Sequence, residues 1–456
     1  MIRAVSAAQR FDSRGNPTVQ VELDTELAHR TQSGKFRALV PSGASTGQHE
    51  AVELRDHDAS RFGGKGVANA VANVRETIGP ALVREQFDAR MQLRDLDAFM
   101  CRLDGTPNKA RLGANAILGV SMAFARLAAA ASRMWADGDD GQGEPLYEFL
   151  RREAGADKGP YIMPVPFFNV LNGGVHSGNT MAFQEIMIAP VGATSFEEAM
   201  RMGSEVYQAL KKILVEKFGS PATGVGDEGG FAPPITKPEE ALDLLTAAVK
   251  SSGYTGKIAF AIDPASSEFF RDGVYDLGFK DKTADRRSPQ QMQQLYQGLV
   301  NGQYPIVLLE DPFAEDDWDS WTEFNKTCGI ELVGDDLLVT NVERVRMADE
   351  RKACNSMLLK VNQIGTVSEA IEAANLAFSL GWGVFVSHRS GETTDDFIAD
   401  LTVALGTGHL KSGAPCRGER VAKYNRLLDI EAELKALGKP CVYAGESFRF
   451  PSKLKT

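Results

Sequence analysis

Five short apolar runs in this sequence are each closed by a polar residue, and this repeated pattern constrains the fold more than any other feature. Three of the closing residues are acids, Asp263, Glu310 and Asp335, and the other two are Lys360 and His388. Parallel strands that end in polar groups bring those groups together at the carboxyl-terminal face of an α/β barrel. The pattern therefore predicts an α/β fold with these five side chains around the mouth of a barrel.

The three acids need a positive partner if they meet at one mouth. Carboxylates ~4 Å apart repel by roughly 4 kcal/mol per pair at an effective dielectric constant of about 20. A set of oxygen ligands selects a hard divalent cation, and Mg²⁺ is the favoured choice. Lys360, at the end of the next strand, then indicates a base that works beside a metal. The alternative is a barrel lysine whose side chain extends to solvent.

Length and composition favour two domains. One barrel uses ~250 residues, so a chain of 456 residues leaves room for one smaller domain. A glycine- and aspartate-rich stretch at 136–144 and a proline-bounded break at 160–166 place the boundary near residue 150. We expect an α+β domain over residues 1–150 and the barrel over residues 151–456.

The first domain contains two strand-like runs, a loop of small residues and a helical region. Residues 18–24 and 35–40 alternate like paired strands, and loop 41–49 is suited to a mobile lid. Helical periodicity dominates 67–135, where 114–131 is apolar on most faces and therefore predicts a buried helix. Beyond the boundary, strand-like runs alternate with helical stretches, as in βα units, at 195–218, 238–252 and 366–380.

Charge and cysteine usage exclude several classes of protein. The net charge is −11 and no basic tract stands out, which argues against nucleic-acid binding and anionic membranes. The five cysteines are scattered without a CxxC pair, which is typical of reduced thiols. No secretory signal and no apolar stretch near the ~20 residues of a membrane span are found. We therefore expect a cytoplasmic protein without a membrane span.

The stretch Gly224-Val-Gly-Asp-Glu-Gly229 has the spacing of a dinucleotide-binding loop. Such a loop must open a helix, however, and the prolines at 233–234 prevent one here. We interpret the glycines as forming a tight loop that presents Asp227 and Glu228.

Four further sites carry polar groups that suit chemistry. His176 lies in a glycine-rich loop, where a histidine is either functional or structural. Glu185 interrupts an apolar strand, and a buried acid of this kind serves either a function or a hydrogen-bond network. The loop 388–393 offers a cation, hydroxyls and an imidazole, which suits a phosphate or carboxylate. Lys411 is a candidate functional residue only if it ends another barrel strand.

These residues resemble one family closely, enolase, the glycolytic phosphopyruvate hydratases. The resemblance runs over essentially the whole chain, from Asp12 to Phe448. Its motifs are Asp12-Ser-Arg-Gly-Asn-Pro17, Ser42-Gly-Ala-Ser-Thr-Gly47, Leu112-Gly-Ala-Asn-Ala-Ile-Leu118, Gly226-Asp-Glu-Gly-Gly230, Leu358-Leu-Lys-Val-Asn-Gln-Ile-Gly365 and Ser387-His-Arg-Ser-Gly-Glu-Thr393. The resemblance implies a C-terminal eight-stranded, TIM-like barrel of the enolase type, which begins ββαα, beneath a smaller α+β domain.

The resemblance also implies a role for each candidate residue. It assigns one Mg²⁺ to Asp263, Glu310 and Asp335, and a second, catalytic Mg²⁺ to a site that Ser45 of the lid joins. Lys360 becomes the base that removes the C2 proton of 2-phosphoglycerate, with a pKa that two Mg²⁺ should lower. Glu228 becomes the acid that assists loss of the C3 hydroxyl, with Glu185 as its partner. The substrate-binding set is His176, Glu185, Lys360, His388, Arg389, Ser390 and Lys411.

The implied activity is the reversible, Mg-dependent dehydration of 2-phospho-D-glycerate to phosphoenolpyruvate by a hydro-lyase, working as a homodimer. Two alternatives stay open: a non-catalytic enolase-like binding or structural protein, and another superfamily member such as a sugar-acid dehydratase or racemase. The chain departs from the family pattern at two longer loops, 26–33 and 136–142, and at Pro264 and Thr394.

Overall fold

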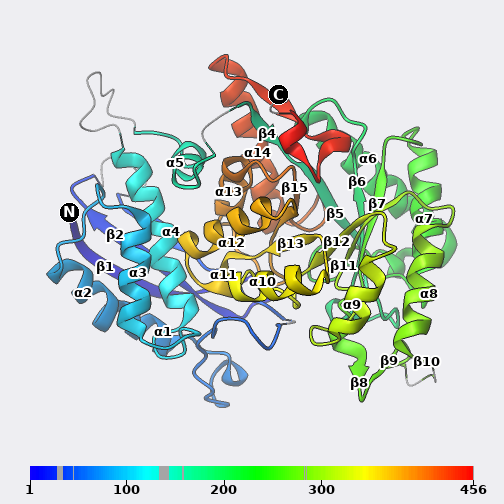
Figure 1. Cartoon of the computed structure of the whole chain (residues 1–456), viewed down its shortest axis with the longest axis horizontal. Coiled ribbons are helices and arrows are strands. Elements are labelled where there is room, and N and C mark those ends of the chain that lie inside the picture. The colour runs from blue at the N-terminus through cyan, green and yellow to red at the C-terminus, as the bar shows by residue number, and fades with distance from the viewer. Residues whose placement is uncertain are drawn as a thin grey trace.

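The computed structural model describes residues 1–27, 34–44, 46–132, 143–156, 159–281, 283 and 285–454. Most of the longer loop 26–33, all of the loop 136–142, and Ser45 of the expected lid therefore lie outside the described residues. The described chain forms two parts, which lie side by side in Figure 1. The N-terminal part is blue to cyan, and the barrel takes the green to red remainder.

The second part is a closed barrel of eight strands, as expected. Its strands, in spatial order, are β11 (Ile306–Glu310), β12 (Glu331–Gly334), β13 (Ser356–Leu359), β14 (Gly383–Ser387), β15 (His409–Lys411), β5 (Val165–Asn172), β6 (Glu185–Ala189) and β7 (Ala259–Asp263). β6 pairs antiparallel with both of its neighbours, and the other pairings are parallel. The chain enters the barrel as two strands followed by two helices, which confirms the expected ββαα start.

The barrel interior is largely apolar, which explains why its strands read as continuous apolar runs. Inward side chains from seven strands pack into one cluster, and helices cover the outer face, so both faces of each strand are buried. The covering helices are α6 (Phe196–Phe218), α7 (Pro238–Ser251), α8 (Pro289–Val300), α9 (Trp318–Asn325), α10 (Val342–Arg351), α12 (Val367–Ser379), α13 (Phe397–Leu405) and α14 (Gly418–Ala436), whereas the short α11 (Val361–Ile364) lies at the mouth. Three of these confirm the helices expected at 195–218, 238–252 and 366–380.

Smaller elements complete the barrel part. β4 (Tyr161–Met163) pairs in parallel with β16 (Cys441–Tyr443), and β8 (Phe270–Arg271), β9 (Val274–Asp276) and β10 (Arg286–Arg287) form a small antiparallel sheet. The stretch 224–229 forms a loop and the next helix, α7, begins only at Pro238, so it does not open a helix as a dinucleotide loop would.

The N-terminal part is a three-stranded antiparallel sheet with helices packed on it. The expected strand pair is present as β2 (Pro17–Thr25) and β3 (Phe36–Leu39). Sequence patterns did not reveal β1 (Ile2–Phe11), because this edge strand is largely exposed and its apolar alternation is weak. The helices are α1 (Ala68–Ala72), α2 (Gly79–Arg84), α3 (Leu93–Asp104) and α4 (Ala114–Ala131), with a π-helical stretch, Asn73–Ile78, between α1 and α2.

Helix α4 is apolar enough and long enough to cross a membrane by composition, but 89% of that stretch is buried inside the protein. This is the environment of a core helix, and it confirms the buried helix predicted at 114–131. Helix α5 (Leu146–Glu153) contains the predicted domain boundary at residue 150 and packs against both α4 and α13. We therefore propose α5 as the segment that joins the two domains.

Asp97 couples the two parts and gives the first testable prediction. Its carboxylate, on α3, accepts the backbone N–H of Ser368 at the start of α12, 3.0 Å away. Burial raises the pKa of Asp97 to about 6. Because the folded state binds the proton more tightly than an unfolded chain does, this contribution to stability is complete below pH ~4 and is lost as pH rises through ~6.

We expect Asp97→Asn to abolish that pH dependence. Between pH 4 and 7 the free energy of unfolding of the native protein should fall by about 2–3 kcal/mol relative to the variant. Urea unfolding of both proteins at several pH values measures the difference directly. Parallel stability curves would contradict the assignment.

Candidate active site

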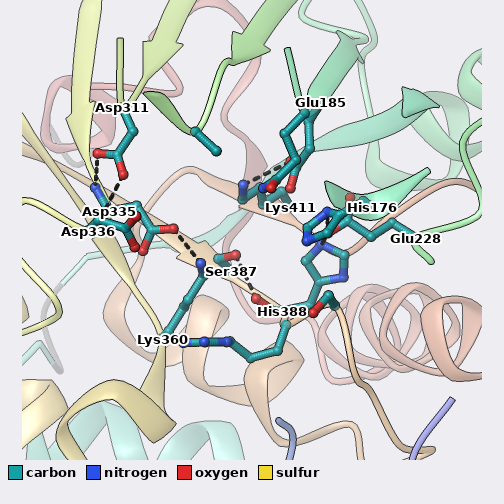
Figure 2. A pocket seen from close by; sticks show the side chains of 14 residues that line it. His176, Glu185, Glu228, Asp311, Asp335, Asp336, Lys360, Ser387, His388 and Lys411 are labelled. Carbon is teal, nitrogen blue, oxygen red and sulfur yellow. Dashed lines mark hydrogen bonds and ion pairs between the residues drawn. The ribbon is translucent and has the colours of Figure 1, made fainter. Parts of the chain in front are cut away.

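The structure brings the sequence-predicted residues to one mouth. β7 ends at Asp263 and β11 ends at Glu310, whereas Asp335, Lys360 and His388 directly follow β12, β13 and β14. Lys411 ends β15, and Glu185 begins β6. Because β6 is antiparallel, its first residue lies at the face where the other strands end. Figure 2 shows Glu185 and Lys411 next to one another in this pocket, with Lys360 and His388 across from them.

Lys411 is the centre of a buried acid cluster. Its Nζ lies 2.7 Å from Glu310, 2.9 Å from Glu185 and 3.4 Å from Asp263. Burial alone would lower the pKa of Lys411, but the surrounding carboxylates raise it well above its ordinary value. Burial also raises the pKa of Glu310 well above its usual range, and Asp263 adds to this. Three acids therefore share one ammonium group.

A second acid group lies beside the first. Asp311, Asp335 and Asp336 each offer an oxygen within 4.8 Å of the other two. The Asp311 carboxylate accepts the backbone N–H groups of Asp335 and Asp336, both at 2.8 Å. Lys360 Nζ contacts Asp335 at 2.5 Å, and Gln363 donates to the other Asp335 oxygen at 2.8 Å. Asp335 is therefore fixed from three sides.

The three acids expected to share one Mg²⁺ divide between these two groups. Asp263 and Glu310 cluster with Glu185 around Lys411, whereas Asp335 pairs with Lys360. Each ammonium group forms ion pairs with the carboxylates that lie next to it. Burial alone would lower the pKa of Lys360, but Asp335 raises it above its ordinary value. That direction is opposite to the lowering expected beside Mg²⁺.

The donor set nonetheless fits a hard divalent cation. The first group carries three carboxylates against one ammonium, and oxygen donors of this kind are those that Mg²⁺ prefers. Glu310 Oε2 is buried and has no hydrogen-bond partner among the residues that the structure describes. The residues of this group could therefore hold a cation in addition to Lys411.

Glu228 lies beside Glu185, between two histidines. Its Oε1 is 3.4 Å from His176 Nδ1 and 3.6 Å from His388 Nε2, and its Oε2 accepts from Asn172 Nδ2 at 3.1 Å. Burial alone would raise the pKa of Glu228, but His176 holds it well below its usual range. His176, Glu185 and Glu228 each place an atom within 4.8 Å of the others.

Glu185 has the opposite electrostatic environment. Burial raises its pKa to about 8, and the charge of Glu228 contributes. Asn169 Nδ2 donates to Glu185 Oε2. Of these two neighbouring acids, Glu185 therefore favours the protonated form and Glu228 the carboxylate, whereas the resemblance implies that Glu228 is the acid.

Arg389 and Ser390 lie where the lid loop meets the pocket. Arg389 Nη1 donates to both oxygens of Glu50, at 3.1 and 3.0 Å. Ser390 Oγ accepts the backbone N–H of Ala44 at 2.9 Å and Arg14 Nη1 at 3.2 Å. These contacts tie the described part of the lid to the loop expected to bind phosphate.

Gly43 gives the second prediction, because a side chain there would displace Arg389. A Cβ at this position would lie 1.8 Å from Arg389 Nη2. Losing a charge-assisted hydrogen bond costs about 1.5–3 kcal/mol, so Gly43→Ala should lower kcat/KM for a phosphorylated substrate by roughly 10- to 100-fold. Gly178→Ala is the matched control, because a Cβ there meets nothing within 4 Å. Equal kinetics for the two variants would show that Arg389 does not bind the substrate.

Sequence reasoning missed several residues that shape this pocket. Asn169 and Asn172 left a detectable signal, since they are fully buried amides in an otherwise apolar strand. Glu50, Asp311 and Asp336 left none, because acids in loops are common. The pocket is lined by His176, Gln184, Glu185, Glu228, Ala265, Asp311, Asp335, Asp336, Lys360, Ser387, His388, Arg389, Ser390 and Lys411.

A closed barrel with an antiparallel second strand and a mouth of acids and lysines, beside a separate α+β domain, defines a lyase-type enzyme of the enolase superfamily. A protein-family model described as "Enolase, N-terminal domain" matches residues 2–136. A second family model, described as "Enolase, C-terminal TIM barrel domain", matches residues 160–452. The chain belongs to the enolase family.

Proposed function

We propose that this protein catalyses the reversible, Mg-dependent dehydration of 2-phospho-D-glycerate to phosphoenolpyruvate, a step of glycolysis and gluconeogenesis. One observation carries the proposal: a single pocket is lined by two lysines, a neighbouring pair of glutamates, the acid group of Asp311, Asp335 and Asp336, and an Arg–Ser pair. These are the groups that proton removal beside a carboxylate, loss of hydroxide and phosphate binding each need.

Lys360 is the proposed base that takes the C2 proton. The lysine must first lose its own proton, so its ion pair with Asp335 has to give way when substrate binds. Removing a proton beside a carboxylate places a second negative charge on that carboxylate. Lys411 is the proposed ligand of this dianion. Mg²⁺ held by Asp263, Glu310 and Asp335, with a second ion that Ser45 is proposed to join, would stabilise the same charge.

Glu228 and Glu185 are the proposed source of the proton that leaves with the C3 hydroxyl. Hydroxide is a poor leaving group and needs an acid within hydrogen-bond reach. The two glutamates lie close together, and the environment of Glu185 favours its protonated form. We propose that Glu185 keeps one proton within the pair and that Glu228 delivers it to the hydroxyl.

The remaining residues bind and orient the substrate. Arg389 and Ser390 are the proposed phosphate ligands, and a guanidinium suits phosphate because it offers parallel donors. His176 and His388 line the wall nearest Glu228. A phosphate displacing Glu50 from Arg389 would also loosen one contact of the lid.

We further propose a cytoplasmic homodimer. The five cysteines are free thiols, which suits a reducing compartment. The proposal of a dimer is based on membership of the enolase family. We also propose that the boundary between the two domains lies near residue 150.

A coupled assay for phosphoenolpyruvate tests the function. The purified protein should convert 2-phosphoglycerate with Mg²⁺, lose activity with a chelator and regain it when Mg²⁺ is restored. A non-catalytic relative would give no product at any Mg²⁺ concentration. A sugar-acid dehydratase or racemase would give none from this substrate but would turn over an unphosphorylated acid.

A further inference from the structure

Arg420, on α14, is a fully buried arginine whose contacts join two loops of the pocket. Its Nη1 donates to Arg389 O at 2.6 Å, and its Nη2 donates to Asp227 O at 2.9 Å and Ser390 O at 2.6 Å. Nη1 also lies 2.7 Å from His388 Nδ1. One side chain therefore spans the Glu228 loop, the Ser390 loop and the His388 ring.

The hydrogen bond between Arg420 and His388 can run in only one direction. A guanidinium has N–H donors and no acceptor, so His388 Nδ1 must accept the hydrogen bond. An imidazole nitrogen that accepts carries no proton, which rules out both the Nδ1–H tautomer and the imidazolium ion. The ring is therefore neutral, and its one proton is on Nε2.

The Nε2–H group points into the pocket. It lies 3.6 Å from Glu228 Oε1 and has no hydrogen-bond partner among the residues that the structure describes. His388 itself is 2% exposed, so solvent does not satisfy this donor. Asn172 already donates to the other oxygen of Glu228, which leaves Oε1 and a nearby substrate oxygen as the acceptors that Nε2–H can reach.

We propose that Arg420 is a positioning residue that locks His388 in the neutral Nε2–H tautomer, so that His388 acts in the pocket only as a hydrogen-bond donor and never as a base. The catalytic role of His388 rests on the proposed function, whereas its tautomer follows from the geometry alone. A donor fixed beside Glu228 Oε1 orients that carboxyl group and the hydroxyl that leaves.

The charges around His388 agree with this assignment. The charged and titratable groups around it include Arg420 at Nδ1, Glu228 with its neighbour His176 on the Nε2 side, and Lys411 and Lys360. Burial, followed by the charge of Arg420, holds the pKa of His388 well below its usual range. The neutral ring persists at pH values where an ordinary histidine is half protonated.

Nitrogen-15 NMR of the imidazole rings in the native protein is the direct test. The His388 signals are assigned by their loss in His388→Gln. We expect a protonated Nε2 and an unprotonated Nδ1 throughout pH 6–8. An Nδ1–H tautomer, or a protonated ring at pH 7, would overturn the proposal, and this result does not depend on which substrate the enzyme uses.

Kinetics of Arg420 variants supply a second readout. In Arg420→Met the ring loses its Nδ1 donor, so kcat/KM for 2-phosphoglycerate should fall roughly tenfold or more. The pKa of His388 should rise toward the ordinary histidine value of ~6.5 but stay below it, because the ring is still buried. Arg420→Lys keeps a charged donor and should restore much of the native pH profile. Arg151→Met is the matched control, because Arg151 is also buried and donates to carbonyls, of Gly159 and Pro160, away from the pocket.

A pH profile in Arg420→Met like that of the native enzyme, in a folded protein, would refute the positioning role. If that variant does not fold, the NMR measurement on the native protein still decides the tautomer. A native enzyme that fails to make phosphoenolpyruvate would refute the proposed function and leave the tautomer result standing.

Discussion

Lys360→Ala is expected to abolish both the dehydration of 2-phosphoglycerate and the exchange of its C2 proton with solvent. General-base catalysis of this kind contributes at least about 10²–10⁴-fold to the rate. Lys411, the other lysine lining the pocket, is held by Glu185, Asp263 and Glu310. No other lining lysine is described that could replace Lys360. Incubation in D₂O, with deuterium at C2 followed by mass spectrometry, measures the exchange.

Glu228→Gln is expected to separate the two reactions. The base and Lys411 remain in place, so C2 exchange should persist while phosphoenolpyruvate formation falls by roughly 10²–10⁴-fold. Asn172 can still donate to the amide oxygen of the new side chain, which makes the substitution conservative in shape. Exchange at a near-native rate in Lys360→Ala, or normal dehydration in Glu228→Gln, would show that these roles are wrong.

The barrel could be predicted because the ends of its strands are marked in the sequence by polar residues. Each parallel strand is buried on both faces and stops at a polar residue, so Asp263, Glu310 and Lys411 mark the mouth in the sequence itself. Glu185 was harder to interpret, because it begins its strand. Only the antiparallel direction of β6, a property of the pairing with β5 and β7, brings it to the same face.

The support around the site could not be predicted, because it depends on contacts between distant segments. Arg420 is 32 residues from His388, and its helix carries no pattern that marks a buried guanidinium. The pairing of Asp335 with Lys360 was also hidden, since residue types alone do not say which ammonium lies nearest to which acid. Local patterns identify candidate reacting groups, whereas the contacts of the packed fold decide their protonation.

The second large effect concerns Lys411 and stability. Lys411→Met leaves Glu185, Asp263 and Glu310 buried without their ammonium. Removing one partner of a buried ion pair costs about 3–5 kcal/mol, so the free energy of unfolding in a chelator should fall by that amount. The matched control is Lys109→Met, which also removes a buried ammonium, from its pair with the partly exposed Glu369, but lies outside the pocket.

Magnesium should then rescue Lys411→Met more than it stabilises the native protein. At a hundredfold excess over Kd, ligand binding adds about 2.7 kcal/mol, and loss of the ammonium leaves the acids with a larger net negative charge for the cation. Glu310→Ala should gain little, because it lacks a proposed ligand, and Lys109→Met should gain as much as the native chain. Urea unfolding of the four proteins in chelator and in Mg²⁺ measures these differences. Equal Mg²⁺ shifts in all four would mean that the acids around Lys411 do not hold the metal.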